Sequence, residues 1–368
     1  MRRILFCTLS SIDNDSRVLK EISTLTKNGF EIVSLSVNTK SNFKFISKVI
    51  NHLPETIFGI PGLALIKLYF IYFRNILSEK EINIMHCNDL NTLPVGVFAK
   101  MFNRKLKLVY DSHEYAINDT PYESRTSIWL KYFIERILIQ FADKVITVSN
   151  SIANEYKRLY KIPKPSIVLN CPRYHEQQKK DIFRNEFNIR PNQKIFLYQG
   201  ALSKGRGIEL MIQVFESFKS DDNILIFMGF GQLETLIKEK ARLSKNIFFK
   251  PAVSSDILLE YTNSSDYGVS FIEDSCLSYR YCLPNKLFEY LMAGIPVLVS
   301  NLYEMKNLVE QYQIGIVATS NSVKGFTKSI EESLNQDYLR IVENVEKSRK
   351  LFCWEEQEKV LLDIYGDL

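Results

Sequence analysis

Two patterns alternate along the first half of the chain. Short apolar runs are typical of strands buried on both faces, and apolar residues spaced three and four apart are typical of helices. The opening unit is an apolar run at 4–9, an amphipathic stretch at 17–28 that ends before a glycine, and an apolar run at 31–37. Further strands are predicted at 84–87, 106–110, 144–149 and 167–170, and helices at 93–101, 127–141 and 150–160. This alternation predicts a parallel α/β sheet.

A second α/β alternation begins at Lys194. Strands are predicted at 195–199, 224–228, 247–249, 267–271 and 297–299, and helices at 208–217, 233–243, 255–262, from 285, from 305, from 323, and at 354–365. The chain of 368 residues therefore divides into a first domain at 1–172, a polar linker at 173–192, a second domain at 193–352 and a last helical segment at 353–368. Two such domains predict a ligand cleft at the carboxyl ends of the strands.

Residues 43–77 fit this alternation poorly. They are rich in apolar and aromatic residues, but prolines and charges interrupt them too often for the 20 or so apolar residues of a spanning helix. We predict one or two helices here. Two interpretations stay open: ordinary packing helices, or contact with a membrane surface through the aromatic residues and the basic residues Lys44, Lys48, Lys67 and Arg74.

The composition of the chain excludes several classes of protein. An apolar fraction of 46% and a charged fraction of 24% describe a globular domain, and a net charge of +5 without a dense basic run gives no support for nucleic-acid binding. The six cysteines lie far apart without a C-x-x-C pair, which argues against a zinc site and a disulfide scaffold. The apolar stretch at the N-terminus ends at Leu9, too early for a signal peptide, so we expect a cytoplasmic protein.

The strongest chemical signal lies at 283–296, a short helix followed by a strand. Pro284 suits the start of the helix, and Asn285 is its expected cap. Helical spacing places Asn285, Lys286 and Glu289 on one face. A helix N-terminus with a lysine binds anions, and a glutamate one turn further on accepts hydrogen bonds from hydroxyl groups. Phosphate beside sugar hydroxyls describes a nucleotide sugar.

A glycine-containing loop at 200–207 follows a predicted strand and opens a helix. Gly200 lets the backbone approach an anion, and Lys204 and Arg206 supply positive charge. The loop is neither a Walker A motif nor G-x-G-x-x-G, so an ordinary turn is the alternative. Gly229 begins a second short glycine motif, which we interpret as a tight turn near the base or the sugar.

In the first domain, polar residues follow the predicted strands. His113 comes directly after a strand and is a candidate for a contact with a sugar hydroxyl or phosphate, with a structural histidine as the alternative. Asp89 and Glu114 lie at equivalent strand ends, where carboxylates can orient an acceptor hydroxyl. Asp15 and Arg17 flank the start of the first helix. For Arg17 the alternatives are an acceptor or diphosphate contact and a surface salt bridge.

These motifs resemble those of the retaining glycosyltransferases of family four, in a subgroup that reads L-P-N-K-L-F-E-Y and is associated with bacterial surface polysaccharides such as capsule and O-antigen. Further similar stretches are Y-Q-G to R-G at 198–207, D-S-H-E-Y at 111–115, I-T-V-S at 146–149 and W-E-x-Q from 354. The resemblance implies a GT-B fold: two Rossmann-like domains, a donor site in the C-terminal one, and a final helix crossing back to the N-terminal domain.

The resemblance also implies residue roles. Arg206 corresponds to the basic residue on the donor diphosphate, Glu289 to the second glutamate of the E-x7-E motif, which binds ribose, and His113 to the histidine on the donor sugar. The predicted catalytic set consists of His113, Arg206 and Lys286. The predicted donor site comprises Gly200, Lys204, Arg206, Gly229, Asn285, Lys286, Leu287 and Glu289. The chain departs from the family at Tyr281, where the first glutamate of E-x7-E belongs, and at Ala201, where a basic residue is frequent.

The implied activity is retaining transfer of a sugar from a UDP or GDP donor to a hydroxyl of a growing, lipid-linked glycan. Arg206, Lys286 and the helix N-terminus can stabilise the leaving diphosphate, so no metal and no cofactor are expected. A nucleotide-sugar epimerase of the same fold and a non-catalytic sugar-nucleotide-binding subunit remain alternatives, the latter because of Tyr281. A nicotinamide dehydrogenase would require a G-x-G-x-x-G motif, which neither domain offers.

Overall fold

The computed structural model describes residues 2–13, 15–41, 45–50, 61–79, 81–176 and 178–368. Two compact units divide the chain. Unit 1 contains Met1–Asp119, Glu123–Val168 and Glu358–Leu368, and unit 2 contains Thr120–Tyr122 and Leu169–Gln357. The chain thus passes between the units at 168–169, and its last residues return to unit 1.

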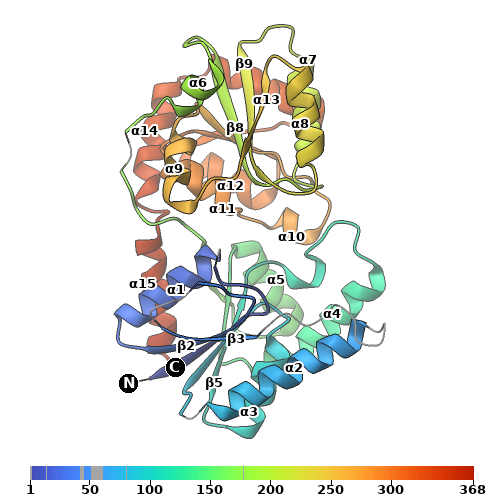
Figure 1. The fold of residues 1–368 in the computed structure, drawn as a ribbon, viewed down its shortest axis with the longest axis vertical. Helices are drawn as coiled ribbons and strands as arrows, with labels where there is room; N and C mark the ends of the chain where they lie inside the picture. Colours follow the sequence, from blue (N-terminus) through green and yellow to red (C-terminus); the bar gives the residue numbers. More distant parts are fainter. Residues whose placement is uncertain (1, 14, 42–44, 51–60, 80, 177) are drawn as a thin grey trace. The chain divides into compact units, whose positions relative to one another are not determined.

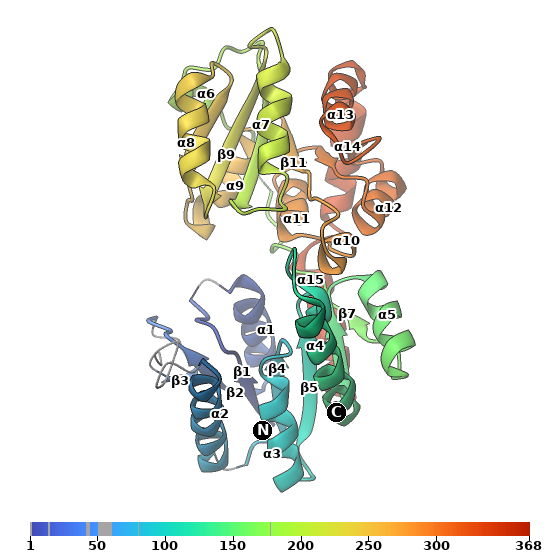
Figure 2. The ribbon, with the colours of Figure 1, turned by 90° about the vertical axis from the view of Figure 1, so that its right-hand side faces the viewer.

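Unit 1 is built on a seven-stranded parallel sheet in the order β3-β2-β1-β4-β5-β6-β7. The strands are β1 Arg3–Cys7, β2 Glu31–Val37, β3 Ile46–Ile50, β4 Ile84–Asn88, β5 Lys107–Ser112, β6 Lys144–Thr147 and β7 Ser166–Ile167. The helices are α1 Ser16–Lys27, α2 Pro61–Ser78, α3 Leu93–Phe102, α4 Arg125–Leu138 and α5 Asn150–Tyr160, with 3-10 turns η1 Ala116–Asn118 and η2 Ile139–Phe141. Helices α2, α3 and α4 lie side by side on one face of the sheet, and α1 lies on the other (Figures 1 and 2), as right-handed crossovers require.

Unit 2 contains a six-stranded parallel sheet in the order β10-β9-β8-β11-β12-β13. Its strands are β8 Lys194–Ala201, β9 Asn223–Phe230, β10 Ile247–Pro251, β11 Tyr267–Ser270, β12 Val297–Val299 and β13 Gly315–Val317. Its helices are α6 Ile182–Phe187, α7 Ile208–Ser217, α8 Glu234–Leu243, α9 Ser255–Asn263, α10 Leu277–Arg280, α11 Asn285–Met292, α12 Tyr303–Tyr312, α13 Val323–Asn335 and α14 Tyr338–Arg349. Helix α15, Trp354–Gly366, begins in unit 2 and ends in unit 1.

Both faces of the unit 2 sheet are buried, as the continuous apolar runs predict. Ile195 and Leu197 of β8 belong to one hydrophobic cluster, whereas Phe196 and Tyr198 belong to the cluster on the opposite face. The side chains alternate because a strand points successive residues to opposite sides. Each fully buried apolar side chain contributes about 1.5–3 kcal/mol.

The structure differs from the local predictions in several places. Residues 46–50 form strand β3, where β-branched Ile46, Val49 and Ile50 suit a strand better than the predicted helix. Strand β13, helix α14 and the short helix α10 were not predicted. Asn285 does not cap α11, because the cap position is Pro284. The predictions for Lys44 and for residues 51–60 lie outside the described residues.

Candidate functional site

Helix α11 is attached to the centre of the unit 2 sheet by Tyr290. The Tyr290 hydroxyl lies 3.0 Å from the carbonyl oxygen of Leu197 and 3.1 Å from that of Val269, and it accepts a hydrogen bond from the Gln199 amide at 3.1 Å. The ring packs directly on Gly268 of β11, where an added Cβ would lie 2.2 Å from it. The helix is therefore held beside the carboxyl-terminal half of β8.

Lys286, in the first turn of α11, has a buried amine for which the described part of the chain offers no salt bridge. It is 8% exposed, its Nζ atom lies 3.6 Å from the centre of the Tyr198 ring, and no described residue forms a hydrogen bond with Nζ. Burial and the nearby charge of Arg206 hold the pKa of Lys286 well below its usual range, while Glu289 acts in the opposite direction. Because an unpaired buried charge is costly, this position favours an anionic ligand.

Glu289, one turn further along α11, presents an oriented carboxylate. Gln199 donates a hydrogen bond to Glu289 Oε2 at 2.5 Å and accepts one from the Thr262 hydroxyl at 2.7 Å. Gln199 was not among the predicted site residues. The signal that could have identified it is its position in the Tyr198-Gln199-Gly200 sequence at the end of a buried strand.

The glycine-containing loop connects β8 to α7 and carries the second positive charge. Gly207 caps α7 with a φ of +72°, and a Cβ there would lie 1.8 Å from the Phe271 carbonyl oxygen, so only glycine fits. The Arg206 guanidinium lies 4.3 Å from the centre of the Tyr279 ring. Lys204 is exposed on the same loop. Arg206 is therefore positioned close enough to Lys286 for the two charges to repel each other.

Of the other predicted donor residues, Gly200 and Asn285 are exposed, whereas Leu287 and Gly229 are buried. Gly200 is the neighbour of Lys286 Nζ, since a Cβ at Gly200 would lie 3.8 Å from that atom. The Leu287 side chain is fully buried in the hydrophobic core and is not available to a ligand. A Cβ at Gly229 would lie 1.9 Å from the Gly200 carbonyl oxygen, so this glycine allows β8 and β9 to approach each other.

An acidic side chain, Glu273, lies beside the glycine-containing loop, eight residues before the position where the family motif has its first glutamate. The Glu273 amide donates a hydrogen bond to the Gly205 carbonyl at 3.0 Å. Burial, and then the charge of Glu209, raise the pKa of Glu273. Tyr281 instead ends the short helix α10, and Asp274 pairs with Arg280 on the surface at 2.9 Å.

In unit 1, His113 lies between two carboxylates. Its Nδ1 atom is 3.6 Å from Asp89 and its Nε2 atom 3.3 Å from Asp111, and Asp89 also accepts a hydrogen bond from the His113 amide at 3.1 Å. Asp89 has a φ of +64°, an uncommon conformation for a residue other than glycine. Although burial favours the neutral ring, Asp89 and Asp111 raise the pKa of His113 to about 10.

Behind His113 lies a fully buried ionic network. Arg17 donates to both carboxylate oxygens of Asp111 at 2.9 Å and to the Val168 carbonyl at 2.7 Å. Although burial alone would raise it, Arg17 and His113 hold the pKa of Asp111 well below its usual range. His86 meets the Tyr365 hydroxyl of α15 at 2.5 Å, so the network includes the end of the chain.

These contacts show what the residues predicted to bind the acceptor do in the structure. Arg17 is 2% exposed and its guanidinium is bonded to Asp111, so the alternative of a surface salt bridge is wrong and a direct acceptor contact has no support. Asp15 caps α1 by accepting a hydrogen bond from the Val18 amide at 3.1 Å. Glu114 remains exposed at the end of β5, and Asp89 orients His113.

Three buried ligand-type side chains of this network, Glu21, His86 and Asp111, have ligand atoms within 4.8 Å of one another. A metal ion would suit that spacing. However, the Arg17 guanidinium lies 3.2 Å from Glu21 and 2.9 Å from Asp111, and thus supplies the positive charge there. Burial and Asp111 raise the pKa of Glu21 to about 8.

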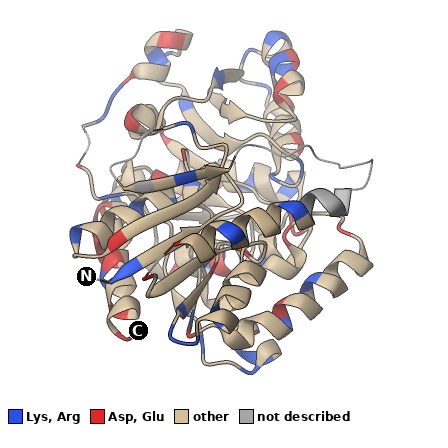
Figure 3. Ribbon diagram, turned by 60° about the horizontal axis from the view of Figure 1, so that its bottom comes forward, with Lys and Arg blue, Asp and Glu red and all other residues tan. Residues whose placement is uncertain are grey.

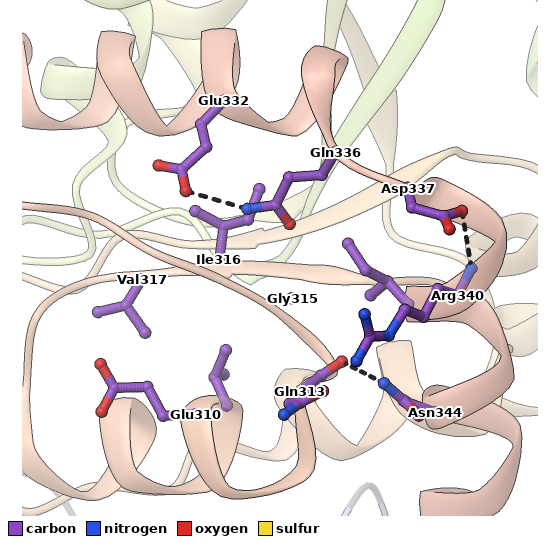
Figure 4. Close-up of a pocket in the computed structure, with 12 residues that line it drawn as sticks. Glu310, Gln313, Gly315, Ile316, Val317, Glu332, Gln336, Asp337, Arg340 and Asn344 are labelled. Carbon is purple, nitrogen blue, oxygen red and sulfur yellow. Dashed lines mark hydrogen bonds between the residues drawn. The ribbon is translucent and has the colours of Figure 1, made fainter.

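A separate pocket of about 490 Å³ lies at the edge strand β13, between α12, α13 and α14 (Figure 4). Its polar residues bond one another: Gln336 to Glu332 at 3.0 Å, and Asn344 to the Gln313 carbonyl at 3.2 Å. None of the predicted donor residues lines it. We therefore place the candidate site at α11 and the glycine-containing loop.

Two family profiles match consecutive parts of the chain: Glycosyltransferase Family 4 at residues 16–172 and Glycosyl transferases group 1 at residues 179–350. Together they follow the two parallel α/β units. The chain belongs to the GT-B glycosyltransferase family. The family resemblance predicted from the motifs is confirmed at this level, while the subgroup and the retaining stereochemistry stay predictions.

Proteins similar to this GT-B chain share only about a quarter of their residues with it over the matched regions. A chitobiosyldiphosphodolichol beta-mannosyltransferase of Debaryomyces hansenii is 24% identical over 65% of this chain, and the match spans only 56% of that relative's length. The processive diacylglycerol alpha-glucosyltransferase of Acholeplasma laidlawii is 25% identical over 67% of this chain and 66% of its own length. The O-antigen biosynthesis glycosyltransferase WclY of Escherichia coli is 25% identical over 74% of this chain and 77% of its own length.

Solved structures support the fold. Sucrose-phosphate synthase from Thermosynechococcus elongatus is similar with a TM-score of 0.78 and 16% identity, covering 100% of this chain and 99% of its own. Anabaena HepE in complex with UDP-glucose is similar with a TM-score of 0.75 and 15% identity, covering 100% of both chains. The predicted GT-B architecture of two Rossmann-like units is thus confirmed.

Proposed function

We propose that this protein is a retaining glycosyltransferase that moves a sugar from a nucleoside diphosphate donor to a hydroxyl of a bacterial surface glycan. The observation that carries the proposal is the Lys286 amine, buried beside Arg206 at the start of α11 and without a hydrogen-bond partner among the residues that the structure describes. A buried lysine beside a second basic side chain, Arg206, and a carboxylate oriented by Gln199 suit a diphosphate and the hydroxyls of a ribose.

The reaction breaks the bond between the anomeric carbon and the diphosphate oxygen and forms a bond from that carbon to the acceptor oxygen. The acceptor proton passes to the departing diphosphate, so atoms and charge balance. Lys286 and Arg206 stabilise the negative charge that develops on the leaving group, and they do so without reorganisation because packing already positions them. For His113, in unit 1, the contact with the donor sugar that the family resemblance implies stays a prediction.

The donor is of the UDP or GDP type, and UDP is favoured because the similar HepE structure contains UDP-glucose. The acceptor is a lipid-linked glycan. Two relatives carry names with lipid acceptors, diacylglycerol and diphosphodolichol, and a third acts in O-antigen biosynthesis. A sugar-nucleotide-binding subunit without transfer is the second candidate, because Tyr281 stands where the family motif has its first glutamate.

Calorimetry with UDP, GDP, UDP-glucose and UDP-N-acetylglucosamine tests the donor site. We expect one nucleoside diphosphate to bind and Glu289→Ala and Arg206→Ala each to weaken it at least tenfold. A matched control, Glu234→Ala on the exposed start of α8, leaves binding unchanged. Wild-type affinity in both site variants would show that the donor binds elsewhere, and donor binding without transfer to any lipid-linked acceptor would favour the binding subunit.

A further inference from the structure

The outer surface of α2, α3 and α4 in unit 1 exposes an unusual number of large apolar side chains. Phe70 on α2 and Phe102 on α3 are each 66% exposed, and Trp129 on α4 is 63% exposed. Others on the same helices are also exposed: Ile66, Leu77, Phe98, Met101, Leu130, Phe133 and Ile137. A contiguous exposed apolar surface of this kind is rare on a protein that meets only water.

The exposed side chains form stripes along the helices. On α4, Arg125, Trp129, Phe133 and Ile137 follow one another at a spacing of four residues, which places them on one face. On α2, Phe70 and Arg74 share that spacing. The three helices lie side by side, and aromatic contacts join α2 to α3, with the Phe73 and Phe98 ring centres 4.4 Å apart (Figure 2).

The charged residues exposed on these three helices are all basic. Helices α2 and α3 contain no acidic residue, and the one acid of α4, Glu135, is fully buried, where the hydroxyls of Tyr110, Tyr156 and Tyr160 donate to it. Exposed basic residues occur along the helices and at the end of α3: Lys67, Arg74, Arg104, Lys105, Arg125 and Arg136. Figure 3 shows α2 with blue and no red along it.

We infer that this face of unit 1 docks onto an anionic lipid bilayer. Exposed aromatic and aliphatic side chains insert at the interface, and the basic residues between them attract anionic headgroups. A protein partner of ordinary composition would not explain why acids are excluded from the exposed surface of all three helices. Among the described helices, none has the length and apolar content needed to cross a membrane, so this surface would lie on the bilayer.

The inference deepens the proposed function, on which its biological purpose rests, since a lipid-linked acceptor is reached from the bilayer surface. It also corrects the sequence-based expectation, which considered only residues 43–77. Much of that segment lies outside the described residues, whereas α3 and α4 supply most of the exposed apolar side chains. A groove of about 270 Å³ between α2 and α3, lined by Tyr69, Phe70, Phe73 and Phe98 among others, gives a lipid chain an apolar place to rest.

The chain carries its own probe for the test. It has two tryptophans, Trp129 on the proposed surface and Trp354, which is fully buried. With vesicles of phosphatidylglycerol and phosphatidylcholine, we expect the full chain to co-sediment and its emission to shift to the blue. Brominated phosphatidylglycerol should quench that emission, and Trp129→Phe should keep vesicle binding but lose both optical signals.

Variants separate lipid docking from other occupants. Arg125→Glu with Arg136→Glu, and separately Trp129→Ala with Phe133→Ala, should weaken vesicle binding about tenfold or more. The control Leu243→Ala with Leu339→Ala removes equally exposed apolar side chains from unit 2 and should bind as wild type does. Glu289→Ala should also bind vesicles normally, so failure of the donor site would leave this result intact.

Two results would overturn the inference. One is wild-type binding to anionic vesicles that is negligible or equals binding to phosphatidylcholine alone. The other is self-association in light scattering that the α4 variants abolish while vesicle binding stays unchanged, which would assign the surface to a second copy of this chain.

Discussion

His113 in unit 1 and Lys286 in unit 2 differ in how nearby carboxylates balance their positive charge. In unit 1, His113 lies between Asp89 and Asp111, and these carboxylates raise its pKa to about 10. In unit 2, Lys286 is buried against Tyr198 and forms no salt bridge with any described residue, and burial with the charge of Arg206 lowers its pKa. A site whose charge is already balanced needs no anionic ligand, whereas the buried Lys286 amine favours one. The contrast is why we assign the diphosphate to unit 2.

The largest expected effect concerns the balanced site. Arg17→Met leaves Asp111 buried without its guanidinium partner, so we expect the free energy of unfolding to fall by about 3–5 kcal/mol. Nucleotide binding should stay unchanged, because Arg17 belongs to the unit 1 network. Urea unfolding checks the first expectation and calorimetry with UDP the second. The double variant Arg17→Met with Asp111→Leu should recover part of the lost stability, and equal stability of Arg17→Met and wild type would show that the network contributes nothing.

Substitution of Lys286 should have the opposite pattern of effects: stability is kept and nucleotide binding is lost. Lys286→Met keeps the side-chain volume and removes the unpaired charge, so we expect unchanged or higher stability and a loss of about 2–3 kcal/mol in the binding of nucleoside diphosphate. Thermal unfolding without ligand and calorimetry with UDP measure the two quantities. A marked loss of stability with unaffected binding would mean that Lys286 is structural.

The charge of His113 gives a pH-dependent prediction. Its pKa is about 10 in the folded chain and near 6.5 in an unfolded one, so its stabilising charge is fully present below pH 6.5 and is lost as pH rises toward 10. The difference in unfolding free energy between wild type and His113→Gln should be about 2 kcal/mol at pH 6 and should shrink by pH 10. A difference that is constant over this range would contradict the proposed ion pairs.

The smallest expected effect sharpens the sugar end of the donor site. Because Glu273 lies beside the glycine-containing loop, Glu273→Gln should leave UDP binding unchanged and weaken the binding of the full nucleotide sugar about fivefold, or about 1 kcal/mol. Asp274→Asn, next to it but paired with Arg280 on the surface, is the matched control. Equal losses in both variants would argue for a general effect on the loop.

Features of the fold and the site that depend on residues close in sequence could be predicted, whereas features that depend on contacts between distant residues could not. The strands and helices of both sheets, and the direction of Lys286 and Glu289 from α11, follow from local periodicity. The burial of Arg17 could not be predicted, because Asp111, its partner, lies on a distant strand that the fold brings alongside. The same reason hid Gln199, whose role depends on Thr262 and Glu289 from two other elements. Strand β13 was missed because its three residues are too few to show a period.

Proton uptake on nucleotide binding tests the central claim most directly. A lysine whose pKa is lowered in the free protein regains its proton when a diphosphate supplies the missing charge, so affinity should fall as pH rises. Calorimetry of UDP binding in two buffers of different ionisation enthalpy measures that uptake. We predict proton uptake by the wild-type protein and its loss in Lys286→Met. Binding without proton exchange in the wild type, or equal uptake in both proteins, would contradict the claim that Lys286 is a buried amine that gains its proton when the donor diphosphate binds.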